Sequence, residues 1–374
     1  MRRGFGLFSV AGIKISVNYT WFIVLGLVIW SLAAVHFPEA YPGFDTATTW
    51  IISVIAALLL FASVLLHELS HSIVGNRLGL GIKGITLFIF GGIAHLGKEP
   101  DDPNTEIKVA AAGPICSLLL SMVFLALYLF LFTVQGDTPL VAVLQYLWFI
   151  NAALLIFNLV PGFPLDGGRV LRAILWKRSG DIRRATRIAS NFGKGFAILL
   201  ILLGLFHVFI LRNLGGIWFV LIGMFLQQTA EGSYKQVLIR NALSGLKVRE
   251  TMSTEVVYVD ASIRLDELVE AYFFRYRFNS FPVVEGTRLI GIVDLHQVKQ
   301  VPRERWPFMT PKDVMHPISE ELVLRPDDDT VDALTKMLKS GWGKLPVVVG
   351  DRLVGILTRR DVMALLKIKT DLGT

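Results

Sequence analysis

Long apolar stretches separated by polar loops dominate the first 229 residues of the chain, whereas the remainder shows the mixed pattern of a soluble protein. A helix needs about 20 apolar residues to cross the ~30 Å hydrocarbon core of a bilayer. The pattern therefore predicts an α-helical polytopic membrane bundle over residues 1–229, followed by a soluble domain. Six segments reach or approach the required length, the last two being the shortest: Tyr19–Val35, Trp50–Val74, Val109–Val134, Leu140–Val160, Gly195–Leu211 and Leu214–Ala230.

The positive charges of the loops predict the orientation of these spans. Lys and Arg gather in the N-terminal arm, in the loop after the second span and above all in the loop after the fourth, whereas the opposite loops hold only Arg212. Positively charged loops stay on the cytoplasmic side. We therefore expect a multi-pass protein of the cell membrane with a cytoplasmic N-terminus and C-terminal domain. Residues 1–17 lack the apolar core and cleavage site of a signal peptide, so the first span is expected to be retained.

Composition supports the membrane assignment, since 53% of the 374 residues are hydrophobic and only 18% are charged. The net charge of +7 would also suit a nucleic-acid-binding protein. The basic loops already explain this charge as a topology signal, so we expect no nucleic-acid partner. The single cysteine, Cys116, lies in an apolar run and cannot form an internal disulfide, so it is interpreted as a packing residue.

The most informative polar residues lie at the end of the second apolar stretch. There His67-Glu68-Leu-Ser-His71 follows the run 50–66, which contains no ionisable side chain. Residues i and i+4 share a helix face, so His67 and His71 can hold one zinc ion while Glu68 reaches a water bound to it. A simpler interpretation is that these side chains only reach toward the membrane surface. It is disfavoured, because three such residues are costly at membrane depth without a function.

A catalytic zinc site uses three protein ligands and keeps one position open for water. The candidate third ligand is Asp166, in the segment Asn158-Leu-Val-Pro-Gly-Phe-Pro-Leu-Asp166-Gly-Gly-Arg, whose prolines and glycines interrupt the fourth span. Such breaks are tolerated at membrane depth where they line a cavity that is filled with water or buried in protein. Asp166 could instead cap the helix that follows, and its position alone leaves both interpretations open.

Together, these two motifs resemble those of the site-two proteases, a family of intramembrane zinc metalloproteases. The similarity covers roughly the first 230 residues and has both motifs in the family's order. It implies that His67, His71 and Asp166 hold zinc and that Glu68 is the catalytic base. It also implies that Asn158 contacts the substrate or the transition state.

The third apolar stretch contains Ala112-Gly-Pro-Ile-Cys-Ser117, which is similar to a small-residue element of the same family. Small side chains allow two helices to approach closely. We therefore expect this stretch to pack beside the zinc ligands.

A transmembrane substrate must unwind locally, because its peptide bonds are hydrogen-bonded within a helix. The segment Ile82–Leu96 predicts two short strands around Gly91-Gly92. One edge of this hairpin could accept the unwound substrate as an added strand. A hairpin that merely plugs the cavity is an equally open interpretation. His95, at the end of the hairpin, is expected to be a solvated residue rather than a ligand.

After a linker at residues 230–246, the soluble half of the chain repeats itself. The stretch that begins Phe281-Pro-Val-Val aligns with the one that begins Leu345-Pro-Val-Val, 64 residues later. Each repeat predicts strand, helix, strand, strand, helix, and two such units are expected to pack as a pair. Residues 247–305 and 306–374 resemble a pair of cystathionine-β-synthase (CBS) domains, which have an α+β fold.

Pairs of this kind often bind adenine nucleotides between the repeats. The family's G-h-h-(T/S)-x-x-D element is present as Gly355-Ile-Leu-Thr358-Arg-Arg-Asp361. It implies that Thr358 holds a phosphate and Asp361 a ribose hydroxyl of ATP, ADP or AMP. The first repeat departs from the pattern, with Asp294 and Gln297 at these positions, which questions one of the two possible sites. A docking or homodimerisation module without a ligand remains the alternative.

The sequence thus predicts an intramembrane zinc endopeptidase that cleaves a transmembrane segment of a membrane protein and is modulated by nucleotide at its CBS pair. By resemblance, an anti-sigma or pro-sigma factor would be a typical substrate. The main alternative is an ion transporter gated by the CBS pair. Transporters place ionisable groups at several midplane positions, whereas the acidic residues of this membrane domain concentrate on Glu68 and Asp166. A metal-dependent lipid hydrolase is a weaker third interpretation.

Overall fold

The computed structural model describes residues 4–89, 91–95, 97–213 and 215–372 of the chain. Its internal contacts divide the protein into two units, residues 1–237 and 238–374. Helix α8 (Gly216–Leu243) contributes residues to both units. Each unit contains apolar clusters of its own, so each has the core of an independent domain.

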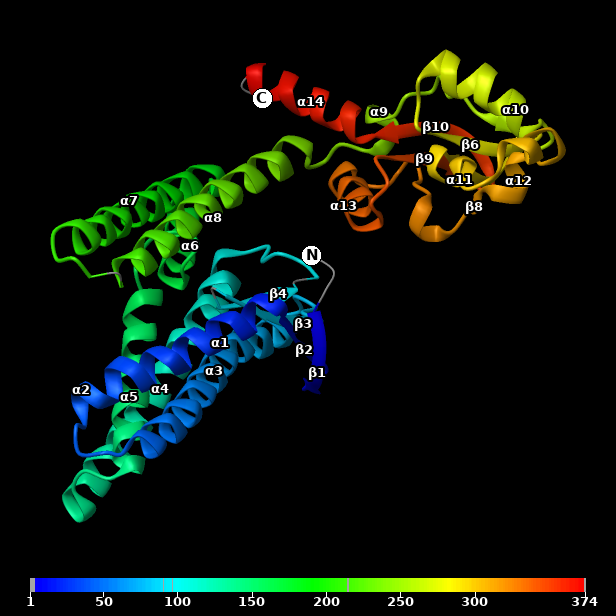
Figure 1. Ribbon diagram of the computed structural model, residues 1–374. Coiled ribbons are helices and arrows are strands. Elements are labelled where there is room, and N and C mark those ends of the chain that lie inside the picture. The colour runs from blue at the N-terminus through cyan, green and yellow to red at the C-terminus, as the bar shows by residue number, and fades with distance from the viewer. Residues whose placement is uncertain (1–3, 90, 96, 214, 373–374) are drawn as a thin grey trace. The chain divides into compact units, whose positions relative to one another are not determined.

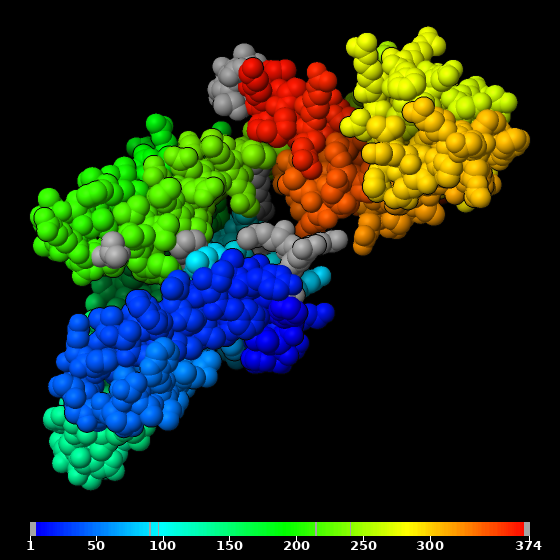
Figure 2. Space-filling view, viewed as in Figure 1, coloured from blue at the N-terminus to red at the C-terminus, as the bar shows by residue number. Residues whose placement is uncertain are grey.

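Long helices with apolar outer faces form the first unit (Figure 1). Phe22, Ile23 and Trp30 are exposed on the helix that forms the dark blue surface in Figure 2. Such a surface marks contact with lipid rather than water, so this unit is a multi-pass membrane domain. In the described part of the chain, five helical segments have the length and hydropathy of a membrane span: Tyr19–Ala40, which comprises α1 (Tyr19–Ser31), a π-helical turn (Leu32–His36) and α2 (Phe37–Ala40), then α3 (Thr46–Arg77), α4 (Pro103–Gln135), α5 (Pro139–Asn158) and α7 (Ile182–Phe209).

The prediction of six spans is therefore confirmed for five of them only. The sixth predicted segment lies in α8, apart from Leu214, which falls outside the described residues. The apolar run of α8 ends at Leu226 and is followed by Gln227 and Gln228. At 1.5 Å per residue, the run from Gly216 to Leu226 covers only about 16 Å, which is short for the hydrocarbon core of a bilayer.

A four-stranded sheet packs against the C-terminal part of α3. Ile85 and Leu87 of the sheet lie in one buried cluster with Leu69 of α3. The strands of the predicted hairpin are confirmed, although Leu96 lies outside the described residues, and the sequence pattern did not predict the two strands that precede them. The strand order is β1-β2-β3-β4, with β1 (Gly4–Val10), β2 (Ile13–Asn18), β3 (Gly84–Phe88) and β4 (Gly91–His95). Among the described strands, only β3 pairs with β4, so the other edge of β4 is open.

The short helix α6 (Asp166–Ser179) follows the interruption of the fourth span. It packs against α4 and α7. The irregular segment before it, residues 159–165, is fixed to α7 by a backbone hydrogen bond in which Phe163 N donates to Ala189 O at 3.0 Å. The break predicted from the prolines and glycines therefore exists, and it brings Asp166 back into the helical bundle.

The second unit contains the two repeats, which share one mixed sheet in the order β5-β6-β7-β10-β9, with β8 beside β7. Its strands are β5 (Val259–Asp260), β6 (Ser280–Glu285), β7 (Arg288–Asp294), β8 (His316–Pro317), β9 (Lys344–Val349) and β10 (Arg352–Thr358). Its helices are α9 (Val248–Thr251), α10 (Leu265–Glu267) with a π-helical continuation (Leu268–Phe274), α11 (Leu295–Lys299), α12 (Pro311–Val314), α13 (Thr330–Ser340) and α14 (Arg359–Leu372), with 3-10 turns at Arg303–Phe308 and Glu320–Leu322.

The first segment of each repeat packs on the other repeat. A Cβ added to Gly355 would lie 2.5 Å from the Sδ atom of Met252, and a Cβ added to Gly291 would lie 2.3 Å from that of Met315. Because both glycines make room for the partner repeat, the two repeats fold as one body, in agreement with the sequence repeat. The exact bounds of the linker and of each repeat remain predictions.

Candidate active site

Three ionisable side chains meet inside the first unit. His67 and His71 lie one turn apart on α3, and Asp166 begins α6. Both Nε2 atoms lie 3.1 Å from Oδ2 of Asp166 and 3.2 Å from each other. All three side chains are buried. The structure therefore brings together, at one point, three side chains that the sequence separates by up to 99 positions.

The spacing and chemistry of these three atoms fit a zinc ion. Two ligands that lie about 2.05 Å from a tetrahedral zinc are separated by about 3.3 Å, close to the distances observed here. Gly113 of α4 provides space for the group, because a Cβ at that position would lie 2.2 Å from His71 Nε2 and 2.6 Å from His67 Nε2. Two imidazoles and a carboxylate are a ligand set of catalytic zinc sites, which keep the fourth position for water.

Helix α4 orients both imidazoles. His67 Nδ1 lies 2.9 Å from Ser117 Oγ, and His71 Nδ1 lies 2.6 Å from the carbonyl oxygen of Val109. Since a carbonyl only accepts hydrogen bonds, His71 Nδ1 must carry a proton, which leaves Nε2 as the atom free to bind a metal. The small-residue stretch of α4 thus packs beside the candidate ligands, as its sequence predicted.

Glu68 lies between the two histidines in sequence and packs against the sheet. A Cβ added to Gly92 of β4 would lie 2.5 Å from Glu68 Cγ. Only a glycine therefore allows the backbone of β4 to pass so close to this glutamate. His95, at the far end of β4, is exposed and forms a hydrogen bond of 2.8 Å with Thr86.

Comparisons with known proteins identify the family. The profile of Peptidase family M50 matches residues 55–138 and 134–202, and that of the CBS domain matches residues 248–303 and 312–368. Rip3 of Mycobacterium tuberculosis is 32% identical over 98% of this chain and 94% of its own. The zinc metalloprotease MJ0392 of Methanocaldococcus jannaschii is 30% identical over 100% of this chain and 99% of its own. The chain belongs to Peptidase family M50.

The protein is accordingly a membrane zinc metalloprotease of the site-two type that carries two CBS domains. A solved site-2 protease from Methanocaldococcus jannaschii is 31% identical to it, over 62% of this chain and 94% of its own, with a TM-score of 0.42. Membership of this family favours the protease over the ion transporter considered from the sequence.

Asn158 ends α5, directly before the irregular segment of the M50 protease. Its amide donates a hydrogen bond of 3.0 Å to Leu154 O of the same helix. Among the described residues it has no hydrogen bond to His67, His71 or Asp166. Its contact with substrate therefore remains a prediction.

A buried ion pair, which the sequence analysis did not single out, links the helices around the site. Arg172 of α6 donates from both Nε, at 2.8 Å, and Nη2 to Oε1 of Glu106 on α4. Glu106 is fully buried and Arg172 is 9% exposed. The guanidinium also lies 4.8 Å from the ring centroid of Phe163, in the segment before Asp166. This pair therefore connects α6, α4 and the irregular segment.

In the second unit, Thr358 and Asp361 bond to each other at the start of α14. Thr358 Oγ1 donates to Asp361 Oδ2 at 2.7 Å, and Asp361 N donates to Thr358 Oγ1 at 3.1 Å. This arrangement is a capping box, and Asp294 and Gln297 form another one at the start of α11. Both pairs therefore have a structural role, and nucleotide binding by Thr358 and Asp361 remains a prediction.

Lys344 is a further residue that the sequence analysis missed. It begins β9 and donates a hydrogen bond to the carbonyl oxygen of Ser280 in the first repeat. Its Nζ lies 5.0 Å from the ring centroid of Phe278 and 5.5 Å from that of Phe281. Burial, with no charged neighbour contributing, lowers the pKa of Lys344 to about 8. A partly desolvated cation between the repeats is suited to bind an anion.

The Arg172–Glu106 pair predicts a coupling between helix packing and metal binding. Arg172→Met leaves the buried Glu106 carboxylate unpaired, which should lower the free energy of unfolding by about 3–5 kcal/mol. Because α6 carries Asp166, zinc affinity should also fall about 10- to 100-fold. Thermal unfolding in detergent and zinc competition with a chelator would measure both effects.

The double variant Arg172→Met/Glu106→Gln should recover most of the lost stability, because no charge is left unpaired. Lys194→Met is the control, since it breaks the exposed pair with Glu231 and should cost no more than about 1 kcal/mol. Unchanged stability and zinc affinity in Arg172→Met would contradict the role of the pair.

Proposed function

We propose that this M50 protease is an intramembrane endopeptidase that hydrolyses a transmembrane segment of a membrane protein. The observation that carries the proposal is the convergence of His67 Nε2, His71 Nε2 and Asp166 Oδ2 within a bundle of membrane-crossing helices. A zinc ion held there would polarise the scissile carbonyl and lower the pKa of a bound water. A single-pass or hairpin protein, such as an anti-sigma or pro-sigma factor, is the kind of substrate we propose.

The depth of the site supports cleavage within the membrane. Helix α3 continues from His67 to Arg77, a distance of about 15 Å at 1.5 Å per residue. The residues before the motif, 50–66, contain no ionisable side chain. His67 therefore lies well inside a hydrocarbon core that is ~30 Å thick.

Glu68 is the proposed general base of the reaction. Its neighbours His67 and His71 are the proposed ligands, so its carboxylate can reach a water at the fourth metal position. It takes a proton from that water and later delivers a proton to the leaving amine. Asn158 is proposed to donate a hydrogen bond to the oxyanion, for which its amide must leave Leu154 O.

The open edge of β4 is the proposed site of substrate pairing. A peptide that adds to a sheet lies about 4.8 Å from its neighbour and satisfies its backbone groups there. Because Gly92 of β4 contacts Glu68, a peptide paired with this edge would pass close to the base. Pairing would therefore unwind the substrate and present it for attack in one step.

The proposed orientation places the N-terminus and the CBS pair in the cytoplasm, because the basic loops lie on that side. Two ends on one side require an even number of crossings. We therefore propose α8 as a sixth and short crossing, which is compatible with local thinning of the bilayer.

Adenine nucleotide is the proposed regulator at the CBS pair. Lys344 would contact a phosphate beside Thr358, and Asp361 would hold a ribose hydroxyl. The support is that Lys344 is a cation between the two repeats whose pKa is lowered by burial. Binding there would shift the equilibrium between conformations of the pair and so change access to the protease site. A homodimer through the CBS pairs is a compatible assembly.

Two substitutions separate the roles of base and ligand. Glu68→Gln should reduce cleavage at least about 100-fold, because the general base is lost, and it should leave zinc content unchanged. Asp166→Ala should lose zinc, because one of three ligands is removed. Cleavage of a membrane substrate in vesicles and metal analysis of the purified variants would test both. Ser70→Ala, in the same turn of α3, is the control, and a wild-type rate for Glu68→Gln would refute the base assignment.

Disulfide trapping tests the strand addition. In a Cys116→Ser, Glu68→Gln background, a cysteine at Ile93 of β4 should cross-link to substrate cysteines at alternate positions, since side chains alternate along a strand. A cysteine at Phe8, on the opposite edge strand of the same sheet, should not. Trapping in no register, or equally from both edges, would exclude pairing with β4.

Nucleotide binding should depend on the charge of Lys344. In the free protein its pKa is about 8, and a bound phosphate would raise it. ATP affinity should therefore be highest below pH 8 and fall as the pH rises above it. Calorimetric titration of the full chain would measure this, with Lys344→Met predicted to weaken binding and remove the pH dependence.

Stability should follow the opposite trend without nucleotide. Because the unfolded lysine titrates near its ordinary value of 10.5, the unfolded state binds more protons between pH 8 and 10.5. The free energy of unfolding of the second unit should therefore rise across this range. Lys339→Met, at an exposed position of α13, is the control for both measurements. ATP binding that is independent of pH, or equal in wild type and Lys344→Met, would contradict a phosphate contact.

A further inference from the structure

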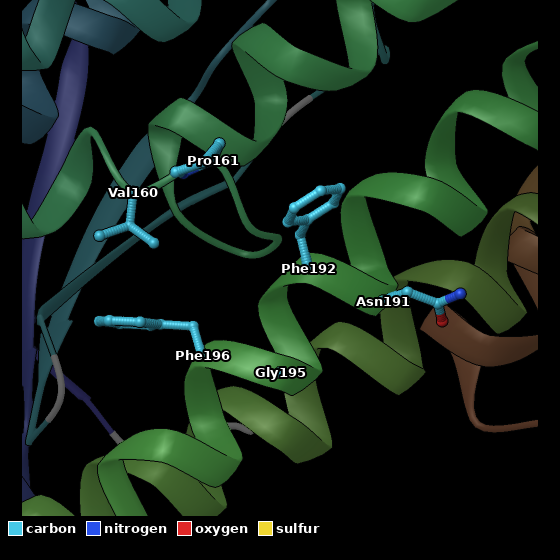
Figure 3. Close-up of a pocket in the computed structure, with 6 residues that line it drawn as sticks. All are labelled: Val160, Pro161, Asn191, Phe192, Gly195 and Phe196. Atoms are coloured by element: carbon cyan, nitrogen blue, oxygen red, sulfur yellow. The ribbon is translucent and has the colours of Figure 1, made fainter.

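Two cavities lie along one face of helix α7. At about 100° per residue, all of the α7 residues that line them fall within an arc of about 140°. The larger cavity has a volume of about 490 Å³ and is lined by Val160, Pro161, Asn191, Phe192, Gly195 and Phe196 (Figure 3). The smaller has a volume of about 280 Å³ and is lined by Leu175, Arg178, Ser179, Arg184, Ala185 and Ile188.

The two cavities differ in polarity. The smaller one has two guanidinium groups at its rim and apolar side chains below them, whereas no charged side chain lines the larger one. Arg184 and Phe196 lie about 18 Å apart along α7, a distance comparable to the ~15 Å hydrocarbon layer of one leaflet. The face therefore offers a cationic site and an apolar groove at the separation of a lipid headgroup from its acyl chain.

The arginines at the rim are available for an anion. Arg178 and Arg184 are exposed, and neither forms an ion pair with a carboxylate in the described part of the chain. The nearest acidic residue in the sequence, Asp181, caps α7 by accepting hydrogen bonds from the backbone N–H groups of Arg183 and Arg184, at 2.8 and 3.1 Å.

The depth of the rim matches the headgroup region. Helix α6 begins at Asp166, within the membrane site, and rises about 20 Å to Ser179 at its other end. Arg178, one residue before that end, therefore lies near the level of the lipid phosphates, where basic pockets between membrane helices hold anionic headgroups.

We propose that an anionic phospholipid binds along this face of α7, with its phosphate between Arg178 and Arg184 and an acyl chain in the larger cavity. Phe192 and Phe196 project from α7 toward the segment that holds Val160 and Pro161, whereas Asn191 points away from it (Figure 3). The chain of the lipid would thus lie against the segment that leads to Asp166. The composition of the leaflet would then influence how firmly that segment is held.

Lipid titration of the delipidated full chain tests the headgroup site. Native mass spectrometry should show palmitoyl-oleoyl-phosphatidylglycerol binding at least about tenfold more tightly than the phosphatidylcholine with the same chains. Arg178→Gln/Arg184→Gln should remove this preference, since each basic residue near the surface contributes to anionic lipid binding. Arg183→Gln/Arg187→Gln removes the same charge from positions of α7 outside the arc, so affinity should stay within about twofold.

A second substitution tests the groove. A Cβ added to Gly195 meets no atom within 4 Å, so Gly195→Leu fills the cavity without a clash and favours the helix. It should weaken phosphatidylglycerol with long chains about tenfold and leave dihexanoyl-phosphatidylglycerol unaffected. Gly26→Leu, at an equally open position of α1, is the control.

Three results would overturn the proposal. Equal loss in both arginine pairs would show diffuse attraction to a charged surface. Equal binding of phosphatidylcholine would remove the role of the headgroup charge. Inorganic phosphate that binds as tightly as the lipid, with no effect of Gly195→Leu, would identify a site for a free anion. Because binding is measured directly, each result is independent of protease activity.

Discussion

Ionisable side chains inside an apolar helical bundle must find partners, and this requirement positions the whole site of the M50 protease. The two motif histidines use Ser117 and the carbonyl of Val109 on α4, which turns their Nε2 atoms toward Asp166. Asp166 reaches them because α6 is held to α4 by Arg172 and Glu106. Each polar contact thus fixes a helix, and together the contacts define one point that fits a zinc ion.

The parts of the site that depend on local geometry could be predicted from the sequence. The spacing of His67 and His71 follows from one helical turn, and Asp166 follows from the need for a third ligand beside a broken span. The Arg172–Glu106 pair could not be predicted, because it joins residues 66 positions apart that carry no local signature. Gly92 was predicted as part of a hairpin turn, whereas its contact with Glu68 depends on how the sheet packs against α3.

The fold shows the same division between local and long-range determinants. Apolar length predicted five spans correctly, but it overestimated α8, whose apolar run ends at Leu226. Strands β1 and β2 are stabilised by pairing with β3 rather than by a pattern of their own. In the second unit, the 64-residue repeat predicted two copies of one fold. The position of Lys344 against Ser280 emerges only when the copies face each other.

X-ray absorption spectroscopy at the zinc edge tests the central claim most directly, because it reports the ligands of the metal in the intact protein. One zinc per chain should be bound by two imidazole nitrogens and by oxygen ligands at about 2.0–2.2 Å, with no sulfur. A chain purified without stoichiometric zinc, or a spectrum that lacks the two imidazoles, would contradict the site formed by α3 and α6.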